Sequence, residues 1–289
     1  MDLAEYDSHR RMIDTDSGPV GYTDIGSGRP VLFVHGIGTN GTLWRNAMAA
    51  LAGERRCLAV DLPMHGTTPD RPGPDLSLTA LAKAVEDFCA ALDLTDLDLV
   101  GNDTGGAVAQ IVAVHQAKRL ASLTLTNCDT QGNVPPRAFK PIWLLARAGL
   151  LTPLAGPRLL TDLPAARKRL FGNTVQDINT LPLDVVRCYL EPLVGTKARA
   201  KRYQSCVAAL NNRDLAAIEP ALRRLEVPTL MVWGTGDVFF DLRYAHWLHD
   251  TIPGATGVVT VDGGRLFFPD ERAADLVPHL RTHWAALNS

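Results

Sequence analysis

The chain has 289 residues, of which 46% are hydrophobic and 21% charged, with a formal net charge of −2. This composition is typical of a soluble globular protein, and the near-neutral charge gives no reason to expect binding to nucleic acid or to an anionic membrane. No apolar run approaches the roughly 18 residues that a membrane span needs. Residues 1–11 are polar and lack the apolar stretch of a signal peptide.

Cysteine usage indicates a reducing compartment. The five cysteines are scattered along the chain and form no Cys-x-x-Cys pair. Such a set is typical of reduced core residues in a cytoplasmic protein. It offers no metal-ligand spacing, so no metal is expected. No nucleotide-binding motif appears either, and we expect no cofactor.

The first half of the chain alternates predicted strands and helices. A hairpin is predicted over residues 10–25. The elements that follow are a strand at 31–34, a helix at 43–51, a strand at 56–62, a polar, proline-rich loop to 76, a helix at 78–92, a strand from 97, a helix to 117 and a strand at 120–126. This alternation predicts an α/β protein with a mostly parallel, doubly wound sheet.

The pattern changes between residues 133 and 219. Eight prolines interrupt helical stretches there and no strand stands out, which predicts a helical insertion. The alternation then resumes with a strand at 229–233, a helix at 241–251, a strand at 257–261 and a helix at 273–287. We therefore expect an α/β core of residues 1–132 and 220–289, with a helical lid of residues 133–219.

The position of the insertion indicates where a site lies. In an open parallel sheet, ligands bind beyond the C-terminal strand ends, and an insertion there would roof the site. Ile37, Asp103, Asp129 and Asp237 each stand just past a predicted strand end. We expect them to converge under the lid, whose many apolar residues predict a small, mainly apolar substrate.

A Gly-x-Asp-x-Gly turn is the most informative motif. Gly101-Asn102-Asp103-Thr104-Gly105 stands between a predicted strand and a predicted helix. A turn this tight holds its central residue out above the sheet, and glycines let strand and helix approach. Asp103 at the tip is a candidate nucleophile or general base. The alternative is that Asp103 merely caps the helix.

Four motifs together resemble the α/β-hydrolase superfamily over nearly the whole chain. They are His35-Gly36, the segment Asp61-Leu62-Pro63-Met64-His65-Gly66, the turn at 101–105, and Trp233-Gly234-Thr235-Gly236-Asp237. The Asp at the turn is similar to the haloalkane dehalogenase and epoxide hydrolase branch. The resemblance implies an α/β-hydrolase fold in which an Asp attacks carbon and a His-activated water cleaves the resulting ester.

The resemblance also implies roles for individual residues. Asp103 would be the nucleophile, and the backbone N–H groups of Ile37 and Thr104 would form the oxyanion hole. The acid of the triad would be Asp237 or Asp129. Both positions are used within the branch, and Asp237 in Gly-Thr-Gly-Asp is the better match.

The catalytic histidine is missing from its usual place. The loop after the last predicted strand runs Gly263-Gly264-Arg265-Leu266-Phe267, followed by an acidic segment, and puts Leu266 where the branch has His. Leucine neither accepts a proton nor orients water. The adjacent Arg265 stays protonated and cannot be a base. No other histidine obviously substitutes, and the lid contains none.

The residues that would bind a halide or an epoxide oxygen also depart from the branch. Thr104 and Ile37 occupy positions where dehalogenases usually carry halide-binding donors. Epoxide hydrolases use lid tyrosines to protonate the epoxide oxygen, and Tyr189 and Tyr203 are the lid tyrosines here. Trp143 is a candidate wall of the pocket, as is Leu266.

Three functional hypotheses remain open. The first is a hydrolase of the epoxide hydrolase or dehalogenase kind with a degenerate triad. The second is a lyase, isomerase or cyclase in which Asp103 is a general base. The third is a catalytically silent protein that binds a ligand or partner. The sequence does not predict the oligomeric state, and the fold alone cannot separate the three.

Overall fold

A computed structural model describes residues 1–70 and 75–287. Its centre is an eight-stranded sheet in the order β1-β2-β4-β3-β5-β6-β7-β8. The first three strands along this edge pair antiparallel, and all later pairs are parallel. The expected mostly parallel α/β sheet is confirmed. Its strands are β1 (Arg10–Thr15), β2 (Gly18–Ile25), β3 (Pro30–Val34), β4 (Arg56–Val60), β5 (Leu97–Asp103), β6 (Leu120–Cys128), β7 (Thr229–Gly234) and β8 (Ala255–Val261).

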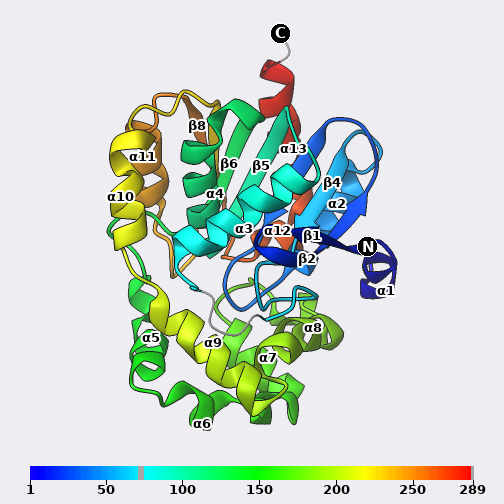
Figure 1. Ribbon diagram of the computed structural model, residues 1–289, viewed down its shortest axis with the longest axis vertical. Helices are drawn as coiled ribbons and strands as arrows, with labels where there is room; N and C mark the ends of the chain where they lie inside the picture. Colours follow the sequence, from blue (N-terminus) through cyan, green and yellow to red (C-terminus); the bar gives the residue numbers. More distant parts are fainter. Residues whose placement is uncertain (71–74, 288–289) are drawn as a thin grey trace.

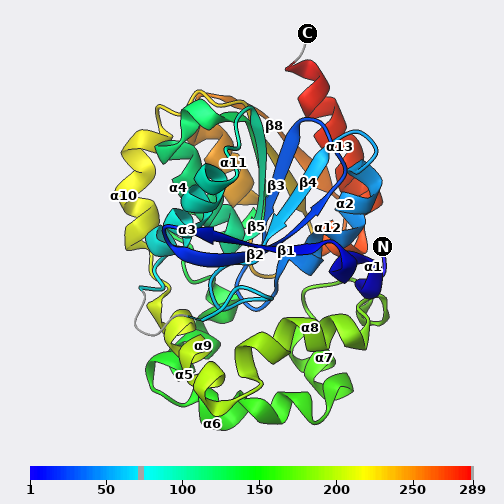
Figure 2. The ribbon, with the colours of Figure 1, turned by 45° about the vertical axis from the view of Figure 1, so that its right-hand side comes forward.

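Helices cover both faces of this sheet (Figure 1). On one face, α3 (Leu78–Ala91) and α10 (Arg213–Leu222) pack against α4 (Thr104–His115). The same face carries α11 (Leu242–Thr251), which packs on β7 and β8. The opposite face carries α2 (Arg45–Leu51), α12 (Phe268–Glu271) and α13 (Ala273–Ala286) (Figure 2). Sheet strands that are buried on both faces favour apolar side chains, which explains the continuous apolar run Val31–Val34 of β3 and the apolar residues Leu97, Leu99 and Val100 of β5.

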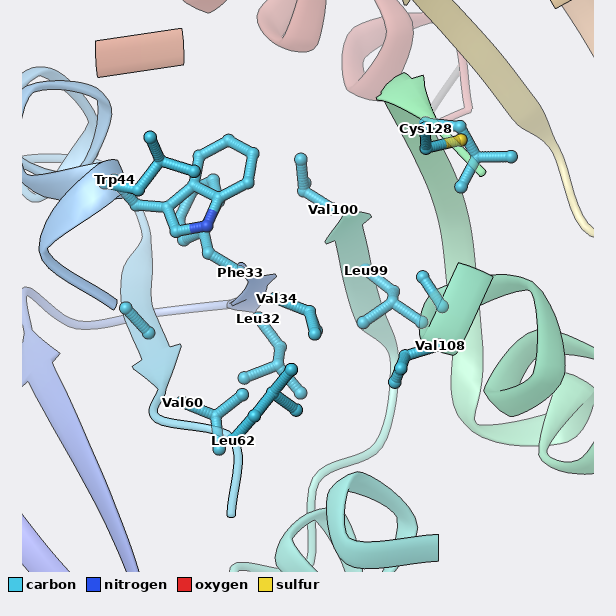
Figure 3. Close-up of a cluster of buried hydrophobic side chains, with 14 of the residues drawn as sticks. Leu32, Phe33, Val34, Trp44, Val60, Leu62, Leu99, Val100, Val108 and Cys128 are labelled. Atoms are coloured by element: carbon cyan, nitrogen blue, oxygen red, sulfur yellow. The ribbon is translucent and has the colours of Figure 1, made fainter. Parts of the chain in front are cut away.

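The core is densest beside the central strands. Figure 3 shows Phe33 of β3 packed near Trp44, and Leu99 of β5 opposite Val108 of α4. All four side chains are fully buried, and the Phe33 and Trp44 rings lie 5.0 Å apart between centroids. This packing fixes the ends of β3 and β5, where the candidate site residues begin.

The insertion between β6 and β7 is helical, as expected, and lies beyond the C-terminal ends of the parallel strands (Figure 2). It contains α5 (Lys140–Arg147), α6 (Leu151–Ala155), α7 (Leu163–Phe171), α8 (Leu183–Val194) and α9 (Lys197–Ala209), with short 3₁₀ turns between them. The following helix, α10, lies beside α4 rather than over the strand ends. The part of the insertion that lies over the strand ends therefore ends with α9.

The other elements follow the sequence prediction within a few residues, with two additions. A short helix, α1 (Leu3–Ser8), precedes the hairpin and is capped by the Asp2 side chain, which accepts from the Glu5 N–H. The four-residue helix α12 was also not predicted. Part of the predicted proline-rich loop, residues 71–74, lies outside the described residues. Within the described part of the chain, no helix has the length and apolarity needed to cross a bilayer.

Candidate active site

Asp103 stands at a strained turn between β5 and α4. Its backbone has φ 57° and ψ −133°, a region that non-glycine residues rarely occupy, and its side chain makes no capping hydrogen bond to α4. A Cβ at Gly105 would come within 2.3 Å of the Val34 carbonyl oxygen, so the turn closes only with glycine there. Strain without a cap favours a functional tip over a helix cap.

The turn that follows β3 lies directly against this carboxyl group. A Cβ on Gly36 would lie 2.1 Å from Asp103 Oδ2, so a side chain at position 36 would displace the carboxyl. The nearby Thr104 backbone N–H favours the charged form of Asp103 and opposes the rise in its pKa. Ile37 follows Gly36 and lines the same cavity as Asp103 and Thr104. The two expected oxyanion-hole residues therefore flank the carboxyl.

A second carboxyl group, that of Asp129, accepts a hydrogen bond from the residue after Asp103. The Thr104 hydroxyl donates to Asp129 Oδ2 at 3.1 Å, while Asp129 Oδ1 has no hydrogen-bond partner among the described residues. Burial raises the pKa of Asp129 to about 7, although the Thr104 hydrogen bond lowers it. Burial, and then the Asp129 and Asp237 carboxyls, raise the pKa of Asp103 well above its usual range.

Asp237 is near this pair but is held by a β6 side chain and by its own loop. Its Oδ2 accepts from the Asn127 side-chain amide at 2.8 Å, and its Oδ1 accepts from the Phe239 N–H at 2.7 Å. Burial raises the pKa of Asp237 to about 6, against these two hydrogen bonds. Asp129 lines the cavity and Asp237 does not.

Leu266 lines the cavity beside Asp103 with a buried side chain. Its carbonyl oxygen accepts from the Asn102 amide at 3.1 Å, which ties the loop to the residue before Asp103. The neighbouring Arg265 turns away and donates to the carbonyl oxygens of Gly172 and Val175 in the lid. An apolar group and no base therefore faces Asp103 from this loop.

The histidines of the two turn motifs serve the fold. His35 Nε2 accepts from the Leu62 N–H at 2.9 Å, which joins the turn after β3 to the turn after β4. Burial lowers the pKa of His35 to about 4 and that of His65 to about 3. His246 is exposed, and His283 is buried. Among the described residues, no histidine lines the cavity.

The cavity itself has a volume of about 350 Å³ and lies between the strand ends and the lid. Its walls are mainly apolar side chains of the lid, for example Ile142, Leu145, Leu159 and Phe171. An apolar, largely preformed cavity with a few polar groups is the usual form of a small-molecule site. The two raised-pKa carboxyls stand where such a molecule would meet them.

The family model of the alpha/beta hydrolase fold matches residues 29–272. The chain belongs to this family. An uncharacterized protein of Mycobacterium tuberculosis is 30% identical to this α/β-hydrolase over 259 residues, which cover 86% of this chain and 73% of the relative. Haloalkane dehalogenase 2 of the same organism is 29% identical over 246 residues, covering 81% and 80% of the two chains.

Solved structures support the same fold for this α/β-hydrolase. The epoxide hydrolase CorEH superposes with a TM-score of 0.79 over 96% of this chain and 99% of that chain, at 19% identity. At this identity the likeness shows the fold alone. Together the comparisons show a family member whose relatives include a haloalkane dehalogenase and whose fold is shared with an epoxide hydrolase.

The aromatic candidates of this α/β-hydrolase separate into two groups. Tyr203 of α9 lines the cavity, and its hydroxyl would be 3.2 Å from a Cβ on Gly38, just past β3. Burial and the nearby Cys206 and Asp103 raise the pKa of Tyr203, so its hydroxyl keeps its proton.

Tyr189 and Trp143 lie elsewhere. Tyr189 is fully buried, packs against Phe171 and does not line the cavity. The Trp143 indole N–H donates to the Leu210 carbonyl oxygen, and its ring lines a separate shallow groove.

Some cavity residues carried no motif in the sequence. Phe239 reaches the wall because its backbone N–H binds Asp237, and Arg169 reaches it from the lid. A loop conformation and a lid rotamer decide these placements. The only sequence signal that favours Arg169 is the basic character of the lid, which the near-neutral total charge conceals.

Proposed function

We propose that this α/β-hydrolase is an enzyme that acts on a small, mainly apolar molecule through the Asp103 carboxylate, by opening an epoxide or displacing a leaving group at carbon. The observation that supports this most is that Asp103 and Tyr203 line the same apolar cavity. A carboxylate supplies the nucleophile, and a protonated phenol on the lid supplies the acid.

The epoxide reaction uses each of these groups once. An Asp103 oxygen forms a bond to an epoxide carbon as the carbon–oxygen bond of the ring breaks. The ring oxygen takes the Tyr203 hydroxyl proton, and the products are an alkyl ester of Asp103, a new alcohol and a tyrosinate that regains its proton from solvent. This step needs no cofactor. The unpaired cysteines fit a reducing compartment, and we propose a cytoplasmic location.

The site is poorly equipped for the second half-reaction, the hydrolysis of the Asp103 ester. Cleaving the ester requires a water activated by a base, and Leu266, which lines the cavity, stands where the resemblance implies a His. The N–H groups near Ile37 and Thr104 would stabilise the oxyanion, but this alone leaves the water unactivated. We therefore expect the ester to accumulate.

A second function is favoured by the raised pKa values of the two carboxyls. Asp103 has a raised pKa, and burial raises that of Asp129 to about 7, which suits general acid–base work near neutral pH. A lyase, isomerase or cyclase would use Asp103 to remove a proton from carbon. The missing water-activating group would then prevent a side reaction.

Intact-protein mass after incubation with epoxides, alkyl halides and activated esters tests the first proposal. We expect a stable adduct that peptide mapping assigns to Asp103 and that Asp103→Asn abolishes. Absence of both adduct and product across the panel would contradict the nucleophile. Exchange of substrate C–H for deuterium, again lost in Asp103→Asn, would support the general base. If neither adduct formation nor deuterium exchange is observed, the protein binds a ligand without turnover.

A further inference from the structure

The lid of this protein is strongly basic although the whole chain is slightly acidic. Residues 133–219 carry thirteen Lys and Arg side chains against six Asp and Glu, a net charge of +7 within a chain of net charge −2. The remainder of the protein is therefore acidic. A positive lid over a cavity attracts anions toward that cavity and repels cations.

One of these cations is part of the cavity wall. Asp103, Asp129 and Arg169 are the three charged residues among the described lining side chains. Arg169 is near the end of α7 and is exposed, as is the lining residue Leu154, which has a relative exposure of 59%. Arg169 and Leu154 therefore mark the mouth of the cavity, and the carboxyls mark its inner end beside the sheet.

The Arg169 guanidinium is available for a ligand. Among the described residues it makes no hydrogen bond or ion pair, whereas the lid-facing Arg265 and the nearby Arg167 donate to carbonyl oxygens. A guanidinium offers several N–H donors in a planar fork that matches a carboxylate. An unengaged guanidinium at the mouth of an apolar cavity is the arrangement that binds the charged end of an apolar chain.

We propose that the cavity binds an anionic amphiphile, a molecule with an apolar chain and a single carboxylate-type group, whose charged end pairs with Arg169 at the mouth. The opposite orientation would bring the anion to Asp103 and Asp129, where charge repulsion and desolvation oppose it. The chain therefore enters with its uncharged end first. This rests on the proposed function in one respect: the reacting carbon would be at the end remote from the anion.

Binding of an unreactive acid tests the proposal without any chemistry. We would measure dissociation constants for decanoate, methyl decanoate and 1-decanol by calorimetry, in the wild type and in Arg169→Gln. Loss of the exposed ion pair should weaken decanoate binding about fivefold, because such pairs contribute up to about 1 kcal/mol. The two uncharged ligands should be unaffected. The decanoate affinity of the wild type should also fall with added salt.

Lys168→Gln is the matched control, since Lys168 is the exposed neighbour of Arg169 and does not line the cavity. This variant removes the same charge from the lid and should bind decanoate almost as well as the wild type. An equal loss in both variants would show that only the general charge of the lid matters and would overturn the assignment. Equal wild-type affinity for decanoate and 1-decanol would overturn it as well.

The same titrations in Asp103→Asn separate this inference from the proposed reaction. Decanoate should bind this variant at least as tightly as the wild type, because a carboxyl at the inner end has been removed. If Asp103 proves unreactive toward every electrophile while Arg169 still selects decanoate, the proposed reaction fails and the ligand class stands. If adducts form at Asp103 with no preference for anionic electrophiles, the proposed reaction stands and the proposed ligand class fails.

Discussion

The Thr104 hydroxyl donates a hydrogen bond to Asp129 while the Thr104 backbone N–H contacts Asp103. One residue thus touches both buried carboxyls. Because the charges repel, ionisation of one carboxyl disfavours ionisation of the other.

This coupling predicts a shifted pH profile in Asp129→Asn. Asp103 must be ionised to attack carbon, so the rate of ester formation should rise with pH through its raised pKa. Removal of the Asp129 charge lowers that pKa, and the rising limb should move to lower pH. The measurement is the rate of adduct formation by mass spectrometry between pH 4 and pH 9. An unchanged limb would mean that Asp129 does not influence Asp103.

The same variant should stabilise the protein at high pH. A carboxyl whose pKa is about 7 when folded and about 4 when unfolded favours folding below pH 4, and this contribution is lost as pH rises through 7. Asparagine carries no such penalty. Thermal unfolding should show little difference between the two proteins at pH 4 and a higher Tm for Asp129→Asn at pH 8, at about 1.4 kcal/mol per pKa unit. Equal Tm differences at both pH values would contradict the burial argument.

Leu266→His should convert an accumulating ester into one that turns over. The Asn102 amide holds the carbonyl group of residue 266, so a new side chain there should enter the cavity beside Asp103. A general base typically contributes about 100-fold or more to rate, and ester lifetime should shorten correspondingly. Leu266→Phe is the control, because it adds a ring without a base. An ester equally long-lived in both variants would count against a base position at 266.

Tyr203→Phe should distinguish epoxides from halides. An epoxide oxygen needs a proton as its ring opens, so ester formation should slow by about 100-fold. A departing halide needs none, and alkyl halides should react at nearly the wild-type rate. Tyr189→Phe removes a hydroxyl that does not reach the cavity and serves as the control. Equal slowing with both substrate classes would indicate a packing role for Tyr203.

Gly36→Ala should abolish adduct formation. The added methyl group would overlap Asp103 Oδ2, and the carboxyl would have to leave its position. Circular dichroism would establish whether the variant folds. Gly53→Ala, at an open position with no atom within 4 Å of the added carbon, controls for glycine substitution. Normal labelling in folded Gly36→Ala would mean that the turn has more room than the structure indicates.

Much of this arrangement could be predicted from the sequence because it depends on local patterns. Apolar runs predicted the strands, and the glycines around Asp103 predicted its turn. Long-range packing was less accessible. Nothing local distinguishes Tyr203, which lines the cavity, from Tyr189, which is buried away from it. Similarly, Asp129 and Asp237 both follow strands, and only the hydrogen bonds from Thr104 and Asn127 separate them.

Arg265 has a consequence for how the protein opens. Its bonds to Gly172 and Val175 are joined by a backbone bond from Phe267 to Thr174, and Glu271 accepts from two further lid N–H groups. Residues 172–177 are thereby fastened to the loop and helix after β8. These contacts hold one side of the lid against the core. The helix α6 contacts α5 and α9, which belong to the lid itself, so any widening of the entrance should begin at α6.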